Sequence, residues 1–144
     1  MENTQNISVL ASEYQEQYAD ENKEKSSSDV SMNVVMHHLS SFLDNDLEAV
    51  MSDYTKESVL ITQAATYTGL QEIKAFLAGL MTNFPKQKSS LALDKMVVND
   101  GLVYIVWHAE TPSLEVPLGA DTFIIKEGNI FRQTFVGQLK FINQ

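Results

Sequence analysis

Residues 54–80 read YTKESVLITQAATYTGLQEIKAFLAGL, and this stretch decides the fold. Val59–Thr62 and Ala65–Tyr67 are rich in β-branched and aromatic residues, which predicts two short strands after a helix that ends at Tyr54. A helix then follows, because apolar residues recur at the spacing of one buried helical face. These residues are Ile73, Phe76, Leu77 and Leu80.

Two short motifs predict where helices begin. In Asn45-Asp46-Leu47-Glu48 a capping residue stands three positions before a Glu, and Thr68-Gly69-Leu70-Gln71 repeats this pattern with a Gln. This spacing is typical of a capping box, in which two side chains satisfy free backbone N–H groups. The first motif predicts a helix that reaches Tyr54, and the second predicts the helix that follows Tyr67.

An earlier helix is predicted from about residue 29. Its apolar stripe repeats every four residues through Val30, Val34, His38 and Phe42, with Val35 and Leu39 beside it.

The hydrophobic period changes to two after Lys88. It predicts strands over 89–99, 102–110, 118–126 and 130 to about 142, with a loop over 111–117 that holds two of the three prolines. Asp100-Gly101 and Glu127-Gly128 are typical of tight hairpin turns. Helices followed by such strands predict an α+β fold, with three helices on one face of a strongly curved, mainly antiparallel sheet.

Composition excludes several classes of function. The 144 residues suffice for one domain, and 19 acidic against 10 basic residues give a net charge of −9. Such a surface does not favour nucleic acid or an anionic membrane as a partner. The absence of cysteine excludes disulfides, Cys-ligated zinc and thiol catalysis. With three histidines, of which His37 and His38 diverge by about 100° on a helix, neither a metal nor another cofactor is expected.

The first 28 residues form a separate, acidic extension, and the domain is predicted over 29–144. Residues 1–29 carry −5 of the net charge and end in Lys25-Ser26-Ser27-Ser28-Asp29, a linker composition. Apolar residues at helical spacing allow a helix over about 7–22, and a solvated tail is the alternative. Neither a signal peptide nor a membrane span is predicted, so a cytoplasmic location is expected.

Several motifs across residues 30–142 carry a family resemblance. They are Asn45-Asp46-Leu47, Tyr67-x-Gly69-x-x-x-Ile73, and Asp121-x-Phe123 followed by Glu127-Gly128-Asn129-Ile130. In this order they resemble the NTF2-like superfamily, and within it the SnoaL-like polyketide cyclases and the ketosteroid isomerases. The resemblance implies a cone-shaped fold with one internal pocket for a small apolar molecule. It also implies a homodimer that forms through the outer face of the sheet.

Strand alternation sorts the side chains that face this pocket. One face of 102–110 is wholly apolar and includes Ile105 and Trp107, and on the last strand Phe131, Gln133 and Phe135 are expected to point inward. The resemblance places Asp121 and Phe123 on the inner face as well. The predicted ligand-binding residues are Tyr54, Thr62, Tyr67, Phe76, Ile105, Trp107, Phe123, Gln133 and Phe135.

Two polar residues on apolar faces are the catalytic candidates. His38 lies on the stripe of the first helix, and Asp121 lies in an otherwise hydrophobic strand face. In an apolar cavity such groups have shifted pKa values, as acid/base chemistry requires. Asp121 matches the pocket Asp that SnoaL-like cyclases use as acid/base and that is an oxyanion donor in the isomerases. His38 falls where the isomerases carry an oxyanion-hole Tyr.

Thr62 occupies the position of the isomerases' proton-shuttling carboxylate, which counts against isomerase chemistry and leaves aldol cyclisation or dehydration. His38 as an ordinary core histidine, and Asp121 as a cap at a bend of the sheet, are the structural alternatives. Three functions therefore remain open: an acid/base enzyme acting on a small apolar carbonyl compound, a non-catalytic ligand-binding protein, and a dimeric interaction module whose contact arm is the acidic extension.

Overall fold

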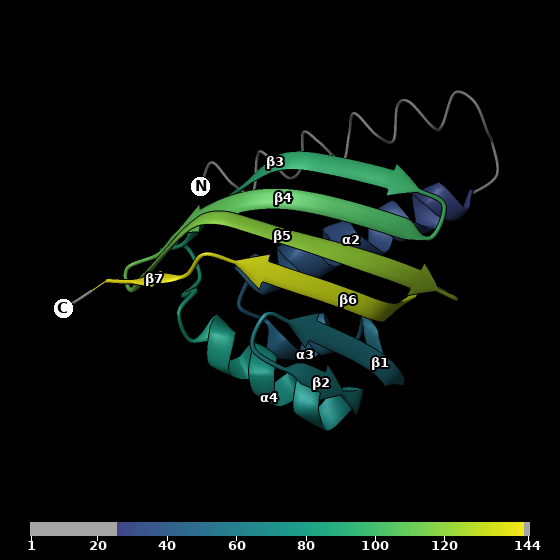
Figure 1. The fold of residues 1–144 in the computed structure, drawn as a ribbon, viewed down its shortest axis with the longest axis horizontal. Coiled ribbons are helices and arrows are strands. Elements are labelled where there is room, and N and C mark those ends of the chain that lie inside the picture. Colours follow the sequence, from purple (N-terminus) through teal and green to yellow (C-terminus); the bar gives the residue numbers. More distant parts are fainter. Residues whose placement is uncertain (1–25, 143–144) are drawn as a thin grey trace.

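The computed structural model describes residues 26–142, and the helix predicted over 7–22 lies outside this range. In chain order the elements are α2 (Ser27–Leu43), α3 (Leu47–Met51), β1 (Tyr54–Thr62), β2 (Thr66–Thr68), α4 (Gly69–Met81), β3 (Ser90–Asn99), β4 (Leu102–Glu110), β5 (Leu114–Lys126), β6 (Asn129–Gly137) and β7 (Lys140–Phe141) (Figure 1). Within the described residues, none of the helices is long and apolar enough to cross a membrane.

One curved sheet organises the domain. Its strand order is β2-β1-β6-β5-β4-β3, and the short β7 pairs with β5. Every neighbouring pair is antiparallel except β1 and β6, which run parallel. The predicted α+β architecture, with three helices and a mainly antiparallel sheet, is confirmed.

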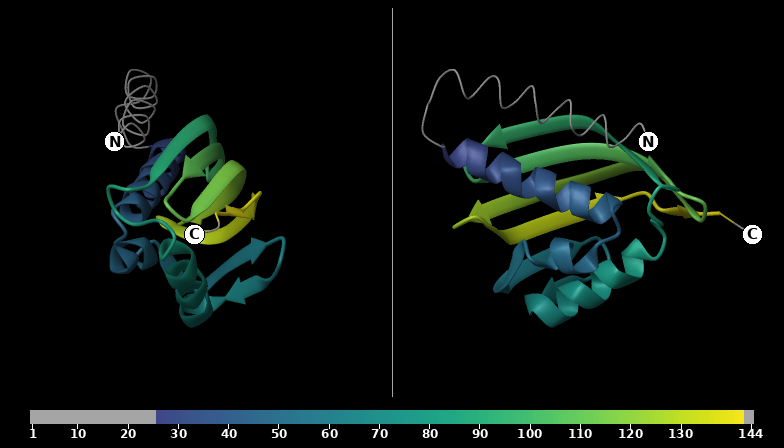
Figure 2. Two further views of the ribbon diagram at one scale, coloured as in Figure 1. Left: turned by 90° about the vertical axis from the view of Figure 1, so that its left-hand side faces the viewer. Right: turned by 180° about the vertical axis from the view of Figure 1, so that it is seen from behind.

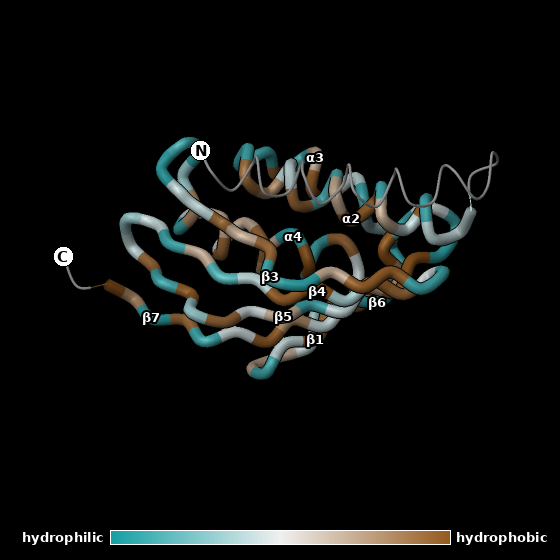
Figure 3. Tube along the Cα trace, turned by 90° about the horizontal axis from the view of Figure 1, so that it is seen from above, coloured by the Kyte–Doolittle hydropathy of each residue, from teal (hydrophilic) through white to brown (hydrophobic). Residues whose placement is uncertain are grey.

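The helices cover the concave face of this sheet. α2 contacts β3, β4 and β5, and α4 contacts β1 and β2 (Figure 2). Hydrophobic positions recur along both layers (Figure 3), and Val35 of α2, Ile73 of α4 and Val103 of β4 are completely buried between them. This burial is the main stabilising term, because free energy is gained roughly in proportion to the apolar area removed from water.

α2 begins at Ser27, within the stretch that has a linker composition. The Ser26 hydroxyl accepts a hydrogen bond from the Asp29 backbone N–H (3.1 Å), and the Asp29 carboxylate accepts one from the Ser26 N–H (3.4 Å). This reciprocal pair is a capping box, and it fixes the first turn of the helix.

Asp46, and not the predicted Asn45, is the N-cap of α3. Its carboxylate accepts from the Ala49 N–H at 3.1 Å. Asn45 instead adopts a positive φ of 54°, and its amide donates to the carbonyl oxygens of Met81 (2.8 Å) and Phe84 (2.7 Å). Asn45 thus fastens the corner between α2 and α3 to the far end of α4.

The predicted helix end at Tyr54 is also wrong, because α3 stops at Met51 and Tyr54 is the first residue of β1. The cap of α4 differs from the predicted one as well. The Thr68 side chain makes no capping hydrogen bond, and Glu72, not Gln71, accepts from the Thr68 N–H at 2.8 Å.

Two bulges change the predicted strand pattern. β5 starts at Leu114 rather than after Pro117, because Pro117 lies in a bulge between β4 and β5, where its missing N–H costs no ladder hydrogen bond. A second bulge, opposite Ile124 and Ile125, reverses the alternation at the start of β6. Ile130 is therefore fully buried, and Phe131, which was predicted to point inward, stacks under the Arg132 guanidinium at 3.8 Å.

Asn45→Ala should lower the free energy of unfolding by about 2–3 kcal/mol. The substitution removes two partly buried hydrogen bonds and places a Cβ-bearing residue without local hydrogen bonds at a left-handed position. Urea unfolding of the full chain measures the loss. Asn45→Gly tolerates the positive φ and should still lose about 1 kcal/mol or more; a glycine variant as stable as the original chain would show that the two bonds contribute nothing.

Candidate functional site

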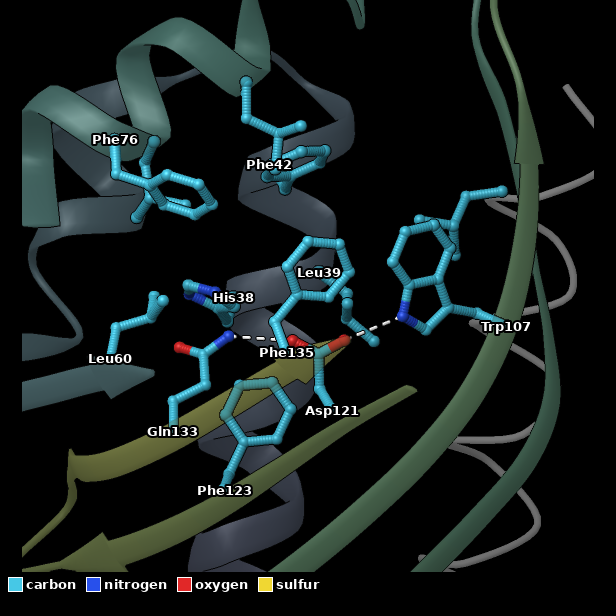
Figure 4. Close-up of a pocket in the computed structure, with 13 residues that line it drawn as sticks. His38, Leu39, Phe42, Leu60, Phe76, Trp107, Asp121, Phe123, Gln133 and Phe135 are labelled. Carbon is cyan, nitrogen blue, oxygen red and sulfur yellow. Dashed lines mark hydrogen bonds between the residues drawn. The ribbon is translucent and has the colours of Figure 1, made fainter. Parts of the chain in front are cut away.

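A cavity lies between α2, α4 and the inner face of the sheet (Figure 4). Most of its wall is aliphatic and aromatic, and its polar side chains are His38, Asp121 and Gln133. The lining residues are His38, Leu39, Phe42, Leu60, Phe76, Leu77, Leu80, Leu91, Trp107, Asp121, Phe123, Gln133 and Phe135.

The two ends of the cavity differ. Phe42, Phe76 and Leu80 are partly exposed and mark the side on which it opens, whereas His38 and Asp121 are buried at the closed end. The cavity has room for only a few water-sized molecules, so a ligand that enters without rearrangement is small.

Asp121 is the chemical centre of the closed end. Its Oδ1 accepts from the indole Nε1–H of Trp107 at 2.8 Å, and its Oδ2 accepts from the amide Nε2–H of Gln133 at 2.9 Å (Figure 4). Burial raises the pKa of Asp121 from 3.8 to about 6, although these two hydrogen bonds and the nearby His38 act in the opposite direction. Its carboxyl group therefore changes protonation state close to neutral pH, as a general acid/base must.

Trp107 is held in place from two sides. Its ring stacks on Phe135 with the centroids 5.9 Å apart, and its partner across the β4–β5 ladder is Gly119. A Cβ at position 119 would lie 2.5 Å from the indole, closer than packed carbon atoms can approach. Gly119 thus leaves the space in which the indole reaches Asp121.

A chain of polar side chains continues from Asp121 toward α2. The amide oxygen of Gln133 accepts from the Tyr54 hydroxyl at 2.5 Å, and that hydroxyl lies 3.3 Å from Nε2 of His38. Nδ1 of His38 lies 3.3 Å from Asp53, whose carboxylate also lies 2.9 Å from Nδ1 of His37. Burial and the charges of Asp121 and Asp53 raise the pKa of Tyr54 well above 10, so its hydroxyl stays protonated.

The structure brings most of the predicted site residues to this one cavity. His38 and Asp121, which come from α2 and β5, meet at its closed end. The other predicted residues that line it are Phe76, Trp107, Phe123, Gln133 and Phe135.

Four predicted ligand-binding residues do not line the cavity. Tyr54 lies behind its wall, within the polar chain, and Ile105 is in the hydrophobic core. Tyr67 stacks on Phe76 with the centroids 4.6 Å apart. Thr62 ends β1, and its hydroxyl bonds to backbone groups of Ala64 and Ala65 in the turn to β2.

Asp53 is the polar residue that sequence reasoning missed. It lies between a helix and a strand and belongs to no hydrophobic pattern. Its position directly before Tyr54 was the one feature of the sequence that could have pointed to it. His37 and His38 were expected to point in different directions from the helix, yet both rings contact the Asp53 carboxylate. Among residues 26–142, no group of three or more His, Cys, Asp or Glu side chains could hold a metal ion.

This chain is similar to known proteins in its fold but not in its sequence. No protein-family model and no curated protein matches the sequence, whereas many solved structures match the fold. An NTF2-like protein of unknown function from Mesorhizobium loti superposes with a TM-score of 0.65 at 15% identity, covering 80% of this chain and 96% of that one. The fold is the NTF2-like fold.

Two further structural neighbours are named for enzymes. A provisionally assigned SnoaL-like polyketide cyclase from Shewanella denitrificans has a TM-score of 0.63 and 14% identity, covering 76% of this chain and 90% of that one. A provisionally assigned ketosteroid isomerase from Kribbella flavida has a TM-score of 0.61 and 9% identity, covering 78% and 80%. At such identities the likeness establishes the fold, and any chemistry has to be argued from the residues of the site.

The Asp121 carboxyl should make the protein less stable as the pH rises. Below about pH 4 the group is protonated in both the folded and the unfolded chain; above about pH 6 folding must bury a charge that the unfolded chain leaves in water. A pKa raised by about 2 corresponds to a loss of about 3 kcal/mol in the free energy of unfolding. Urea unfolding between pH 4 and pH 8 should show this loss relative to Asp121→Asn. Parallel pH profiles for the two proteins would contradict it.

Proposed function

We propose that this chain is a SnoaL-like pocket protein that performs acid/base chemistry on a small, largely apolar carbonyl compound, with Asp121 as the group that moves the proton. The observation that carries the proposal is one carboxyl group, fixed by two donors at the closed end of an apolar cavity, with a pKa of about 6. A pKa close to the working pH gives a useful population of both the acid and the base form.

The chemistry assigned to Asp121 is proton transfer next to a carbonyl group. Ionised Asp121 takes a proton from the carbon beside the carbonyl, and the electron pair of the broken C–H bond moves into the enolate. Protonated Asp121 then returns the proton to carbon or to an oxygen. His38 faces the same cavity and is the candidate for polarising the carbonyl oxygen.

Two considerations favour a cyclase- or dehydratase-type reaction over isomerisation. Thr62 carries no carboxylate, and its hydroxyl is engaged with the backbone of the β1–β2 turn. The Shewanella neighbour is named as a SnoaL-like polyketide cyclase, which supports the same reaction class by similarity of fold. Non-catalytic ligand binding is the alternative, and it predicts a retained ligand with no chemical change.

Asp121→Asn should slow proton exchange by at least about 100-fold, the scale of a general-base contribution. The probe is a panel of small 1,3-diketones in D2O, whose central carbon takes up deuterium as enolate forms and is reprotonated; NMR follows the rate. Asp94→Asn is the matched control, because Asp94 is exposed and bonds to His108 outside the cavity. Exchange by the original chain no faster than buffer, or an undiminished rate in Asp121→Asn with the fold intact, would overturn the assignment.

We also propose that the outer face of the sheet joins two copies of this chain. On β3–β6 this face exposes a patch of apolar side chains, and the ladder sets Val97 opposite Tyr104 and Leu102 opposite Ile124. The residues of the patch are Val97, Leu102, Tyr104, Ile124 and Val136. No acidic residue lies within it, so two chains of net charge −9 can meet there without opposing their carboxylates.

Tyr104→Lys should convert the dimer to a monomer, because a two-fold contact places the new charge close to its symmetry mate in a desolvated interface. Size-exclusion chromatography with light scattering gives the mass directly. Leu70→Lys is the control, since Leu70 is similarly exposed but lies on α4. A monomeric original chain, or a Tyr104→Lys variant that remains a dimer, would refute this interface.

A further inference from the structure

The polar chain behind Asp121 extends well beyond the two residues assigned to the reaction. It runs from Asp121 through Gln133 and Tyr54 to His38 and Asp53. All five side chains are buried, so their donors and acceptors need partners, which are the other members of the chain together with Trp107 and His37. This requirement determines where the hydrogen atoms lie.

With Asp121 ionised, the hydrogens can be placed in one consistent way. Both carboxylate oxygens accept, so Gln133 presents Nε2 to Asp121 and its carbonyl oxygen to Tyr54. The Tyr54 hydroxyl has one hydrogen and donates it to Gln133. For the 3.3 Å contact with His38 to be a hydrogen bond, the Tyr54 oxygen must accept, so Nε2 of His38 carries a hydrogen in this arrangement.

The other nitrogen of His38 faces an acceptor as well. Nδ1 lies 3.3 Å from the Asp53 carboxylate, which can only accept, so in this arrangement both ring nitrogens carry a hydrogen. Asp53 is shared with His37, whose side chain is 49% exposed and brings this end of the network to the surface. β3 and α4 contribute only apolar side chains to the cavity, and β4 contributes Trp107.

Protonating Asp121 reverses the three hydrogen bonds that link it to His38 through Gln133 and Tyr54. Trp107 still donates to Oδ1, so the new hydrogen is on Oδ2 and points at Gln133. The Gln133 amide must turn over to present its oxygen, and its Nε2 then donates to Tyr54. The Tyr54 hydrogen turns toward His38, whose Nε2 must now be bare, while Nδ1 still donates to Asp53.

We propose that Gln133 and Tyr54 form a hydrogen-bond switch through which Asp121 and His38 share one proton. When the N–H bond at His38 Nε2 breaks, an O–H bond forms at Asp121 Oδ2, so imidazolium and carboxylate become imidazole and carboxylic acid with no change in total charge. Gln133 and Tyr54 are positioning residues in this exchange. A catalytic role for this proton exchange rests on the proposed function: the exchange would return Asp121 to its starting protonation state after each proton transfer.

Asp121→Asn fixes the switch in one state. In this variant the side-chain oxygen at position 121 accepts from Trp107, so the side-chain amide nitrogen faces Gln133 and forces the reversed orientation. In ¹⁵N-histidine NMR of the full chain at about pH 8, about two units above the pKa of Asp121, His38 Nε2 should bear a hydrogen in the original protein and none in Asp121→Asn. The chain has three histidines, so variants at His37 and His108 suffice to assign the signals.

Tyr54→Phe breaks the connection without touching Asp121, and the protonation of His38 Nε2 should then be the same with Asp or Asn at position 121. Tyr67→Phe removes a hydroxyl from a tyrosine that stacks on Phe76 at the cavity wall, and it should leave the difference intact. An identical state of His38 Nε2 in the original chain and in Asp121→Asn would overturn the switch. The measurement uses no substrate, so failure of the diketone exchange alone would refute only the proposed function.

Discussion

The burial of one carboxyl group is the constraint on which the rest of the site depends. Asp121 cannot be desolvated without donors, because an unpaired buried charge costs several kcal/mol. The chain supplies one donor from β4 and one from β6, the two neighbours of β5. Each donor is fixed in turn, Trp107 by Phe135 and by the space above Gly119, and Gln133 by the Tyr54 hydroxyl. The register of β4, β5 and β6 thus places both hydrogen-bond donors beside the Asp121 carboxylate.

Much of this arrangement could be predicted from sequence, because hydrophobic period reports which face of an element is buried. The stripe of α2 placed His38 on its inner face, and the alternation of β4 placed Trp107 there. The bulges at Pro117 and Phe131 could not be predicted, since a shift in ladder register depends on the partner strand and leaves no mark in the local pattern. Asp53 was missed for a related reason: its partners are on a helix 15 and 16 residues earlier, and only the tertiary fold brings them together.

The parallel pairing of β1 with β6 positions one member of the polar chain. It places Tyr54, at the start of β1, against the end of the sheet where Ile130 and Gln133 lie, although 79 residues separate Tyr54 from Gln133 in the chain. Known structures at 9–15% identity share this fold.

The open side of the cavity and most of its closed end are built from different layers of the protein. Phe42, Phe76 and Leu80, at the open side, belong to helices, whereas Trp107, Asp121 and Gln133, at the closed end, belong to strands. Mutations in α4 or at Phe42 can therefore alter the open side while Trp107, Asp121 and Gln133 keep their strand register; His38 is the one polar group of the closed end that a helix supplies. The shape of the opening and the surroundings of the buried carboxyl are therefore encoded largely by separate sets of codons, so one can drift while the other is preserved.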